Sequence, residues 1–111
     1  MTPEMKTLLL NTRRTLRTNA TMMQNSRIGF LVLRDGAKDP NKKAVLKAYL
    51  SMLPEMVALL RSVANEADKY LRAGTITDDD FDSFRQRSQR AFIQSKAMCD
   101  ETLSVLETQT V

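Results

Sequence analysis

The first quarter of the chain has its apolar positions on one face of a helix. Thr2 precedes Pro3 and Glu4, the order typical of a helix N-cap, a first helical position and an acidic residue beside the positive end of the helix dipole. Placed at about 100° per residue, the residues that can face a core form one stripe: Met5, Leu8, Leu9, Thr12, Leu16, Asn19, Ala20 and Met23. The pattern predicts a helix from Thr2 onward, and its phase is lost after Asn25.

The next segment, "RIGFLVLRDG" at residues 27–36, is ambiguous between helix and strand. A strand here would find no partner strand elsewhere in the chain. An unbroken helix would bring Arg27 and Arg34 onto the buried stripe. We interpret the segment as a buried continuation of the first helix, with a place for a kink near Gly29 and an end at residues 35–36.

A second helix is expected after the polar loop "AKDPNKK", residues 37–43, and we place its start at Lys42. Pro54 falls inside its apolar pattern. Because proline lacks a backbone donor and clashes with the preceding turn, a kink or a restart is expected at residues 51–54. Helical spacing then continues through Met56, Leu60, Val63, Ala67 and Tyr70. Gly74 ends the helix in the position that glycine commonly takes.

A third helix is predicted to begin after Thr77, which can cap it, with the acidic residues 78–80 in its first turn. Its inward stripe consists of Phe81, Phe84, Ser88, Phe92, Ser95, Cys99, Thr102 and Leu106. The connection before it, residues 75–77, is short. The second and third helices should therefore lie antiparallel.

These elements predict an all-α fold of about three long helices, the second kinked near Pro54, packed as an antiparallel bundle or an extended helical hairpin. The length of 111 residues fits a single helical domain, residues 1–111. Three glycines and three prolines are few for a fold with many turns. Hydrophobic residues at 42% and charged residues at 27% are ordinary for a globular protein.

The acidic cluster raises the alternative of a calcium loop. Asp78, Asp80 and Asp82 match the first three ligand positions of such a loop. The glycine that the loop needs is replaced by Ser83, and its bidentate glutamate is replaced by Gln89. The helix-cap interpretation is therefore preferred, and no metal site is predicted.

The end of the second helix is similar to the helix-turn-helix of short bacterial C-terminal oligomerisation domains. Those domains carry a glycine, an Ile-Thr pair, acidic residues and a phenylalanine before an amphipathic helix. The matching residues here are Gly74, Ile76, Thr77, Asp78, Asp79, Asp80 and Phe81. The resemblance covers about a dozen residues, in which helix-stop and helix-start chemistry needs the same residue types. It favours self-association and does not assign the chain to that family.

Signals for catalysis are scarce. The chain has no histidine, the commonest general base and metal ligand, and it has no glycine-rich phosphate loop. Its single cysteine, Cys99, lies on the inward stripe of the third helix, which is typical of a structural thiol. We therefore expect a protein that is not an enzyme and that has no cofactor.

Cysteine usage and hydropathy bear on location. One cysteine cannot form an intramolecular disulfide, so an intracellular and cytoplasmic location is the default. No apolar run reaches the roughly 18 residues of a membrane span, so no membrane insertion is expected. Residues 5–27 share the Arg-rich, acid-free composition of organellar transit peptides. Glu4 and the helical stripe favour an integral first helix instead.

Charge divides the chain into two halves. Residues 1–50 hold ten basic and three acidic residues, a net +7, and residues 51–111 hold seven and ten, a net −3. The basic residues that could contact a polyanion or an acidic partner are Lys6, Arg13, Arg14, Arg17, Lys42 and Lys43. Two other roles are a solvated surface and pairing with the chain's own cluster at residues 78–82.

The apolar positions exceed what three amphipathic helices need. Residues 28–33 and 56–60 are apolar around most of a helix, as in helices that are central in a bundle or covered by a second copy. The candidate protein-interface residues are Ile28, Phe30, Leu31, Met56 and Leu59. The sequence thus favours a small non-enzymatic interaction protein, such as an adaptor, a chaperone-like subunit or an inhibitor, that binds another protein through helical faces as a homo-oligomer. The alternative is a nucleic-acid-binding accessory factor that uses the basic first helix on phosphates.

Overall fold

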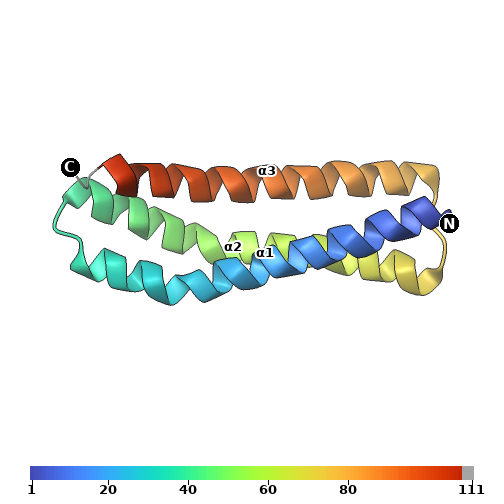
Figure 1. The fold of residues 1–111 in the computed structure, drawn as a ribbon, viewed down its shortest axis with the longest axis horizontal. Helices are drawn as coiled ribbons and strands as arrows, with labels where there is room; N and C mark the ends of the chain where they lie inside the picture. The colour runs from blue at the N-terminus through green and yellow to red at the C-terminus, as the bar shows by residue number, and fades with distance from the viewer. Residues whose placement is uncertain (109–111) are drawn as a thin grey trace.

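The computed structural model describes residues 1–108 and contains three long helices, which confirms the predicted all-α fold (Figure 1). Helix α1 runs from Pro3 to Gly36, α2 from Pro40 to Ala73 and α3 from Asp78 to Thr108. The helices lie side by side, and the molecule is elongated, with extents of 54 × 20 × 17 Å. Consecutive helices run antiparallel, as the short connections predict.

Three of the helix caps that the sequence predicts are present in the structure. The Thr2 side chain accepts a hydrogen bond from the Met5 N–H at 3.1 Å and caps α1. The Thr77 hydroxyl does the same for the Asp80 N–H at 3.1 Å before α3. Gly74 follows α2 with a φ of 71°, a left-handed conformation that disfavours residues with a Cβ atom. Each cap satisfies a backbone group that would otherwise lack a partner.

The start of α2 differs from the prediction by two residues. Asp39, rather than a residue next to Lys42, is the N-cap, and its side chain accepts a hydrogen bond from the Asn41 N–H at 2.9 Å. Pro40 takes the first helical position, where its missing N–H costs nothing. The connection between α1 and α2 is therefore shorter than the polar composition of residues 37–43 indicated.

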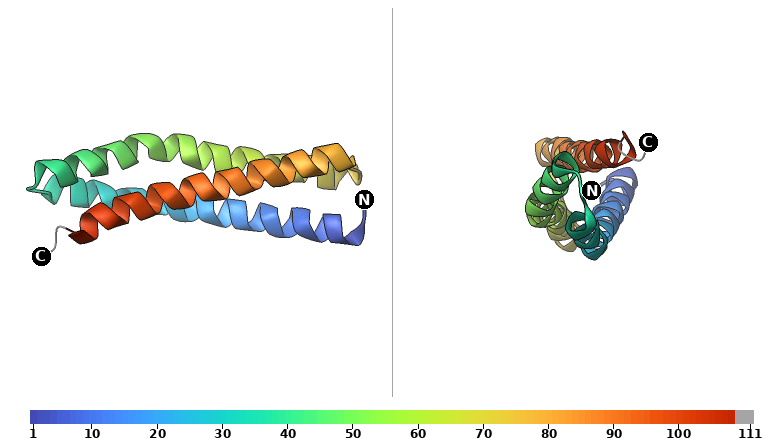
Figure 2. Two further views of the ribbon diagram at one scale, coloured as in Figure 1. Left: turned by 90° about the horizontal axis from the view of Figure 1, so that it is seen from above. Right: turned by 90° about the vertical axis from the view of Figure 1, so that its left-hand side faces the viewer.

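Helix α2 continues through Pro54. Of the two outcomes expected at residues 51–54, a kink or a restart, the restart does not occur, because the chain is helical on both sides of the proline. Helix α2 is bowed along its middle part, as the left view of Figure 2 shows. A proline inside a helix produces such a bend by removing one bond of the backbone ladder.

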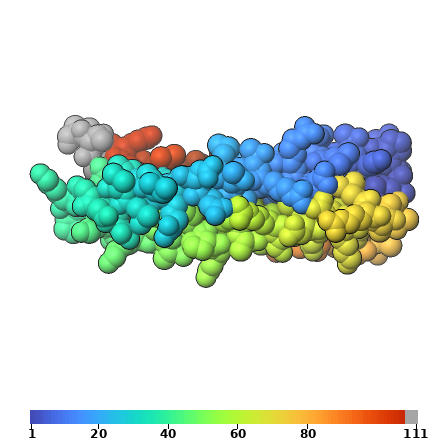
Figure 3. Space-filling model, turned by 90° about the horizontal axis from the view of Figure 1, so that it is seen from below, coloured from blue at the N-terminus to red at the C-terminus, as the bar shows by residue number. Residues whose placement is uncertain are grey.

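The core is formed by one face of each helix. Its buried members are Leu9, Leu16, Ala20, Met23, Tyr49, Leu53, Val57, Leu60, Val63, Ala64, Ala67, Phe84, Ala91 and Met98. Helices α1 and α2 form the main pair and share one face of the molecule along its length (Figure 3). Helix α3 packs chiefly on α2, with few contacts to α1 (Figure 2).

The end of α1 is helical, as interpreted from the sequence, but it is not a buried continuation. Ile28 is 73% exposed and Val32 66% exposed. Arg27 is exposed and Arg34 is half-buried, although an unbroken helix was expected to bring both to the core stripe. The core of α1 ends with the buried Met23, and beyond it only one side of the helix is covered.

Candidate functional site

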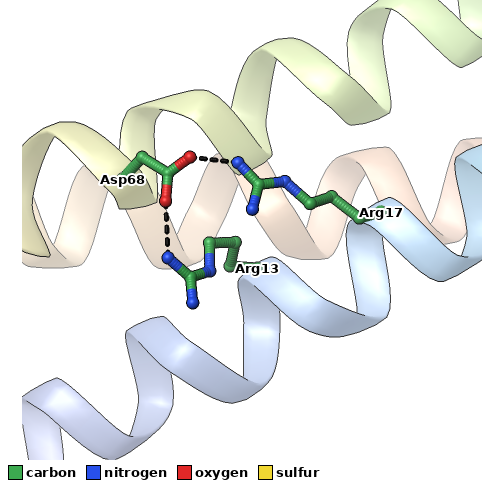
Figure 4. Close-up of polar contacts among 3 residues, drawn as sticks. All are labelled: Arg13, Arg17 and Asp68. Atoms are coloured by element: carbon green, nitrogen blue, oxygen red, sulfur yellow. Dashed lines mark hydrogen bonds and ion pairs between the residues drawn. The ribbon is translucent and has the colours of Figure 1, made fainter.

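The basic residues of α1 are partly used inside the molecule. Arg13 places its Nη1 2.5 Å from Oδ1 of Asp68 on α2, and Arg17 pairs with the other oxygen of the same carboxylate (Figure 4). The Asp68 side chain is only 15% exposed. Two of the six candidate polyanion contacts therefore hold α1 to α2. The acidic residues 78–82, the internal partner considered from the sequence, have no ion pair with them in the described part of the chain.

The ion pair between Arg17 and Asp68 could have been predicted from the register of α1 against α2. In an antiparallel pair, Gln24 faces Arg61, and the two side chains are hydrogen-bonded. Moving back from Gln24 to Arg17 along α1 and forward from Arg61 to Asp68 along α2 covers the same number of residues. The register that pairs Gln24 with Arg61 therefore also pairs Arg17 with Asp68. This register can be predicted only when the position of the turn between α1 and α2 is known.

The ion pairs make stability depend on acid. The hydrogen bond from Arg13, followed by that from Arg17, holds the pKa of Asp68 below its ordinary value. A carboxyl with a lowered folded-state pKa contributes stability that is complete above its unfolded pKa of about 3.9 and is lost as the pH falls through the folded pKa. We expect Asp68→Asn to lower the free energy of unfolding by about 1 kcal/mol at pH 7, and we expect this effect to shrink steadily as the pH falls below about 3.9, in urea titrations.

The matched control for that experiment is Glu66→Gln. Glu66 pairs with Nε of Arg87 at 3.0 Å, and both side chains are more exposed than Asp68. Its effect at pH 7 should be smaller, because solvent screens an exposed ion pair. An Asp68→Asn effect that persists unchanged at acid pH would show that charge is not its cause.

The remaining basic candidates do not form one surface. Lys6 and Arg14 are exposed on α1, toward the end of the molecule where the chain begins (Figure 1). Lys42 and Lys43 lie in the first turn of α2, at the opposite end of the 54 Å length. The basic residues of α1 and those at the start of α2, which the sequence analysis treated as one candidate set, therefore lie apart in the structure.

The candidate protein-interface residues are also divided. Ile28 and Leu59 are exposed, at 73% and 38%. Phe30 and Met56 are half-buried and pack against the core. Leu31 is half-buried as well. The sequence did not single out Val32 and Leu33, which are 66% and 49% exposed and follow Ile28 within two turns. We refer to Ile28, Val32 and Leu33 as the α1 apolar end.

A cavity of about 480 Å³ lies between α1 and α3. Its walls include Met23 and Phe30 from α1 and Phe92 and Leu103 from α3. Tyr49 of α2, 2% exposed, also lines it and stacks against Phe30 with ring centroids 4.5 Å apart. The sequence indicated the inward direction of several of these side chains but not the space between them.

The Tyr49 hydroxyl has a weak hydrogen-bond partner in the sulfur of Cys99. Cys99 Sγ lies 3.8 Å from it, and sulfur is a poor hydrogen-bond partner. Burial, with a smaller contribution from Cys99, raises the pKa of Tyr49 to about 12, and the Ser26 hydroxyl opposes that rise. The neutral phenol is therefore strongly preferred in the folded protein.

That preference can be measured by alkaline titration. A raised folded-state pKa contributes stability that is complete below the unfolded pKa of about 10 and is lost as the pH rises through the folded value. In the Tyr70→Phe variant, which leaves Tyr49 as the only tyrosine, we expect phenolate absorbance at 295 nm to appear with a midpoint near 12, or together with unfolding. A midpoint near 10 with circular dichroism unchanged would contradict the burial of this side chain.

Metal and membrane chemistry find no support in the described part of the chain. Among residues 1–108, no group of three or more His, Cys, Asp or Glu side chains is placed to hold a metal ion. No described helix is both long enough and apolar enough to cross a bilayer.

Comparison with known proteins gives no match: no family model, no curated protein and no solved structure matches the chain. The local likeness to short oligomerisation domains around Gly74 therefore has no support from a family model. Any function has to be argued from the residues of this chain.

Proposed function

We propose that the chain is a small, non-enzymatic helical interaction protein that binds protein through its helical faces and does so first with a second copy of itself. The observation that carries this proposal is the exposure of the α1 apolar end, where Ile28 is 73% and Val32 66% exposed. These two residues are one helical turn apart and share a face. Exposed apolar residues that lie together are typical of interaction sites, whereas scattered ones are not.

A second copy is the occupant that this face fits best. Two copies related by a two-fold axis would each bury the same apolar turns, and the surface would be complementary to itself. Arg34 places its Nη2 3.1 Å from Asp35 Oδ1, so one of the positive charges beside this face is paired within the chain. The oligomer would then present its remaining helical faces to another protein, as an adaptor, a chaperone-like subunit or an inhibitor does.

The test is the mass in solution, by light scattering coupled to gel filtration over a range of concentrations, for the wild type, Ile28→Lys and Ile93→Lys. Ile93 is the matched control because it is 69% exposed on α3 and has glutamine and arginine neighbours. We expect an oligomer for the wild type and for Ile93→Lys, and a single chain for Ile28→Lys with helix content unchanged. A wild type that stays a single chain, or an Ile28→Lys oligomer of unchanged mass, would refute self-association through this face.

No specific observation favours the nucleic-acid alternative. Arg13 and Arg17 are already paired with Asp68, and Lys6 and Lys42 lie at opposite ends of the molecule. The same gel filtration can test it. Nucleic acid that co-purifies at low salt, seen in the absorbance at 260 and 280 nm, and leaves at high salt would reinstate it, because phosphate contacts weaken steeply with salt.

A further inference from the structure

The cavity between α1 and α3 has the dimensions of a small-molecule site. Its volume of about 480 Å³ falls within the roughly 300–1,000 Å³ that is typical of ligand pockets. A single alkyl chain, which is thinner than a helix of about 10 Å diameter, fits within this volume. Ile28 and Val32 of the α1 apolar end do not line the cavity.

Most of the cavity wall consists of apolar side chains or of serines whose hydroxyls are already hydrogen-bonded. Met23, Phe30 and Phe92 contribute side chains with no polar hydrogen. The hydroxyls of the two serines in the wall bond to carbonyls of their own helices: Ser26 Oγ donates to the Met23 carbonyl at 2.6 Å, and Ser95 Oγ donates to the Phe92 carbonyl at 3.0 Å. Their donors are therefore not free for a ligand, and the wall would accept a hydrocarbon chain.

Besides the half-buried Asn19 side chain, two polar groups interrupt that wall. One is the Tyr49 hydroxyl, on a side chain that is 98% buried, which lies 3.8 Å from Cys99 Sγ and also interacts with the Ser26 hydroxyl. The other is Lys96, which is exposed and is the one charged residue of the cavity lining. Within residues 1–108 its ammonium group has no ion pair.

From this arrangement we propose that the cavity between α1 and α3 binds a single-chain amphiphile with an anionic head, of the fatty-acid class. The hydrocarbon chain lies between Phe30 and Phe92, and the carboxylate stays at the exposed side of the cavity against Lys96. Apolar burial supplies most of the affinity, since each buried methylene contributes about 0.8 kcal/mol. The lysine selects the sign of the head group.

The first experiment is a calorimetric titration of the purified chain with dodecanoate, dodecanol and dodecylamine, each below its aggregation concentration. We expect one dodecanoate per chain and weaker binding of the alcohol and the amine. Lys96→Gln should weaken dodecanoate binding about fivefold and leave dodecanol binding unchanged. Arg90→Gln, which removes an exposed positive charge from the same helix outside the cavity, should leave both unchanged. Equal binding of all three compounds, or equal losses in the two variants, would overturn the anionic specificity.

The second experiment locates the ligand without a substitution. Cys99 is the only cysteine of the chain, is partly exposed and lines the cavity. Its alkylation by the neutral reagent iodoacetamide, followed by mass spectrometry, should slow at least fivefold when dodecanoate is saturating. An unchanged rate with ligand bound would place the binding elsewhere and overturn the proposal.

The alkylation rate of Cys99 also reports whether a second copy of the chain covers the cavity. If Cys99 is unreactive at high protein concentration and becomes reactive on dilution to single chains, a second copy covers the cavity and the ligand proposal fails. If it is unreactive at every concentration, the cavity is closed to solvent and the proposal also fails. Loss of oligomers in Ile28→Lys with dodecanoate binding retained would separate this site from the proposed interaction face.

Discussion

Replacing Phe84 by alanine is expected to lower the free energy of unfolding by about 3–5 kcal/mol. Phe84 has no exposed surface, and it is the only α3 residue among the largest fully buried side chains in the described part of the chain. Its ring is surrounded by the common core, so its removal leaves a cavity as well as losing the transfer free energy of the ring.

The loss of stability in Phe84→Ala should mainly weaken the packing of α3. This helix packs chiefly on α2, and much of its inward stripe consists of small hydroxyl residues. Ser88, Ser95 and Thr102 are buried, but each spends its hydroxyl on a carbonyl of its own helix rather than on a neighbouring helix. Phe84 is therefore the largest fully buried apolar side chain that α3 contributes, with Ala91 and Met98 buried beside it and Phe81 and Phe92 packed at the edge of the core.

Urea unfolding gives the free energy, and hydrogen exchange tells which helix is released. In Phe84→Ala we expect α3 amides to lose protection before those of α1 and α2, as local unfolding units do. The matched control is Phe81→Ala, one turn away and half-buried, which should cost only about 1–2 kcal/mol. Equal costs for the two variants, or uniform loss of protection in all three helices, would contradict the view of α3 as a separately anchored element.

The helix ends could be predicted from the sequence because the groups that form them are neighbours in the chain. Thr2, Gly74 and Thr77 act on backbone groups within four residues, so residue type alone identifies them. The start of α2 was missed for a related reason. Asp39 and Pro40 give a better cap and first position than Lys42, but the lysines that follow resemble a loop in composition.

The contacts between helices could not be predicted in the same way. Whether Ile28 is buried depends on which face of α1 meets the other helices, since Phe30 packs against the core while Ile28 is exposed, and not on how apolar residues 28–33 are. The pairing of Arg13 and Arg17 with Asp68 depends on the register of two helices. A charge pattern read along the chain suggested the denser acidic cluster near Thr77 instead. The cavity is harder still, because it depends on the separation of α1 and α3, which no stripe encodes.

A substitution at Pro54 tests a feature that sequence and structure describe differently. Pro54→Ala is expected to raise the free energy of unfolding by about 1–3 kcal/mol. Proline cannot donate to the Leu50 carbonyl and its ring crowds that turn, yet α2 stays helical on both sides. An alanine there supplies the missing N–H group and has the highest helix propensity. The measurement is the urea midpoint at constant slope, which reports stability without a change in compactness.

The adjacent exposed position provides the control, since Glu55→Ala makes a similar propensity change without restoring a backbone bond and should alter stability by no more than about 0.5 kcal/mol. A gain in Pro54→Ala and none in Glu55→Ala would show that the bow of α2 is imposed by the proline and tolerated by the bundle. A loss in Pro54→Ala would reverse the causal order. The bend would then be needed to bring Leu53 and Val57, both nearly buried, against their neighbours, and a straighter α2 would lose more apolar burial than the recovered hydrogen bond contributes.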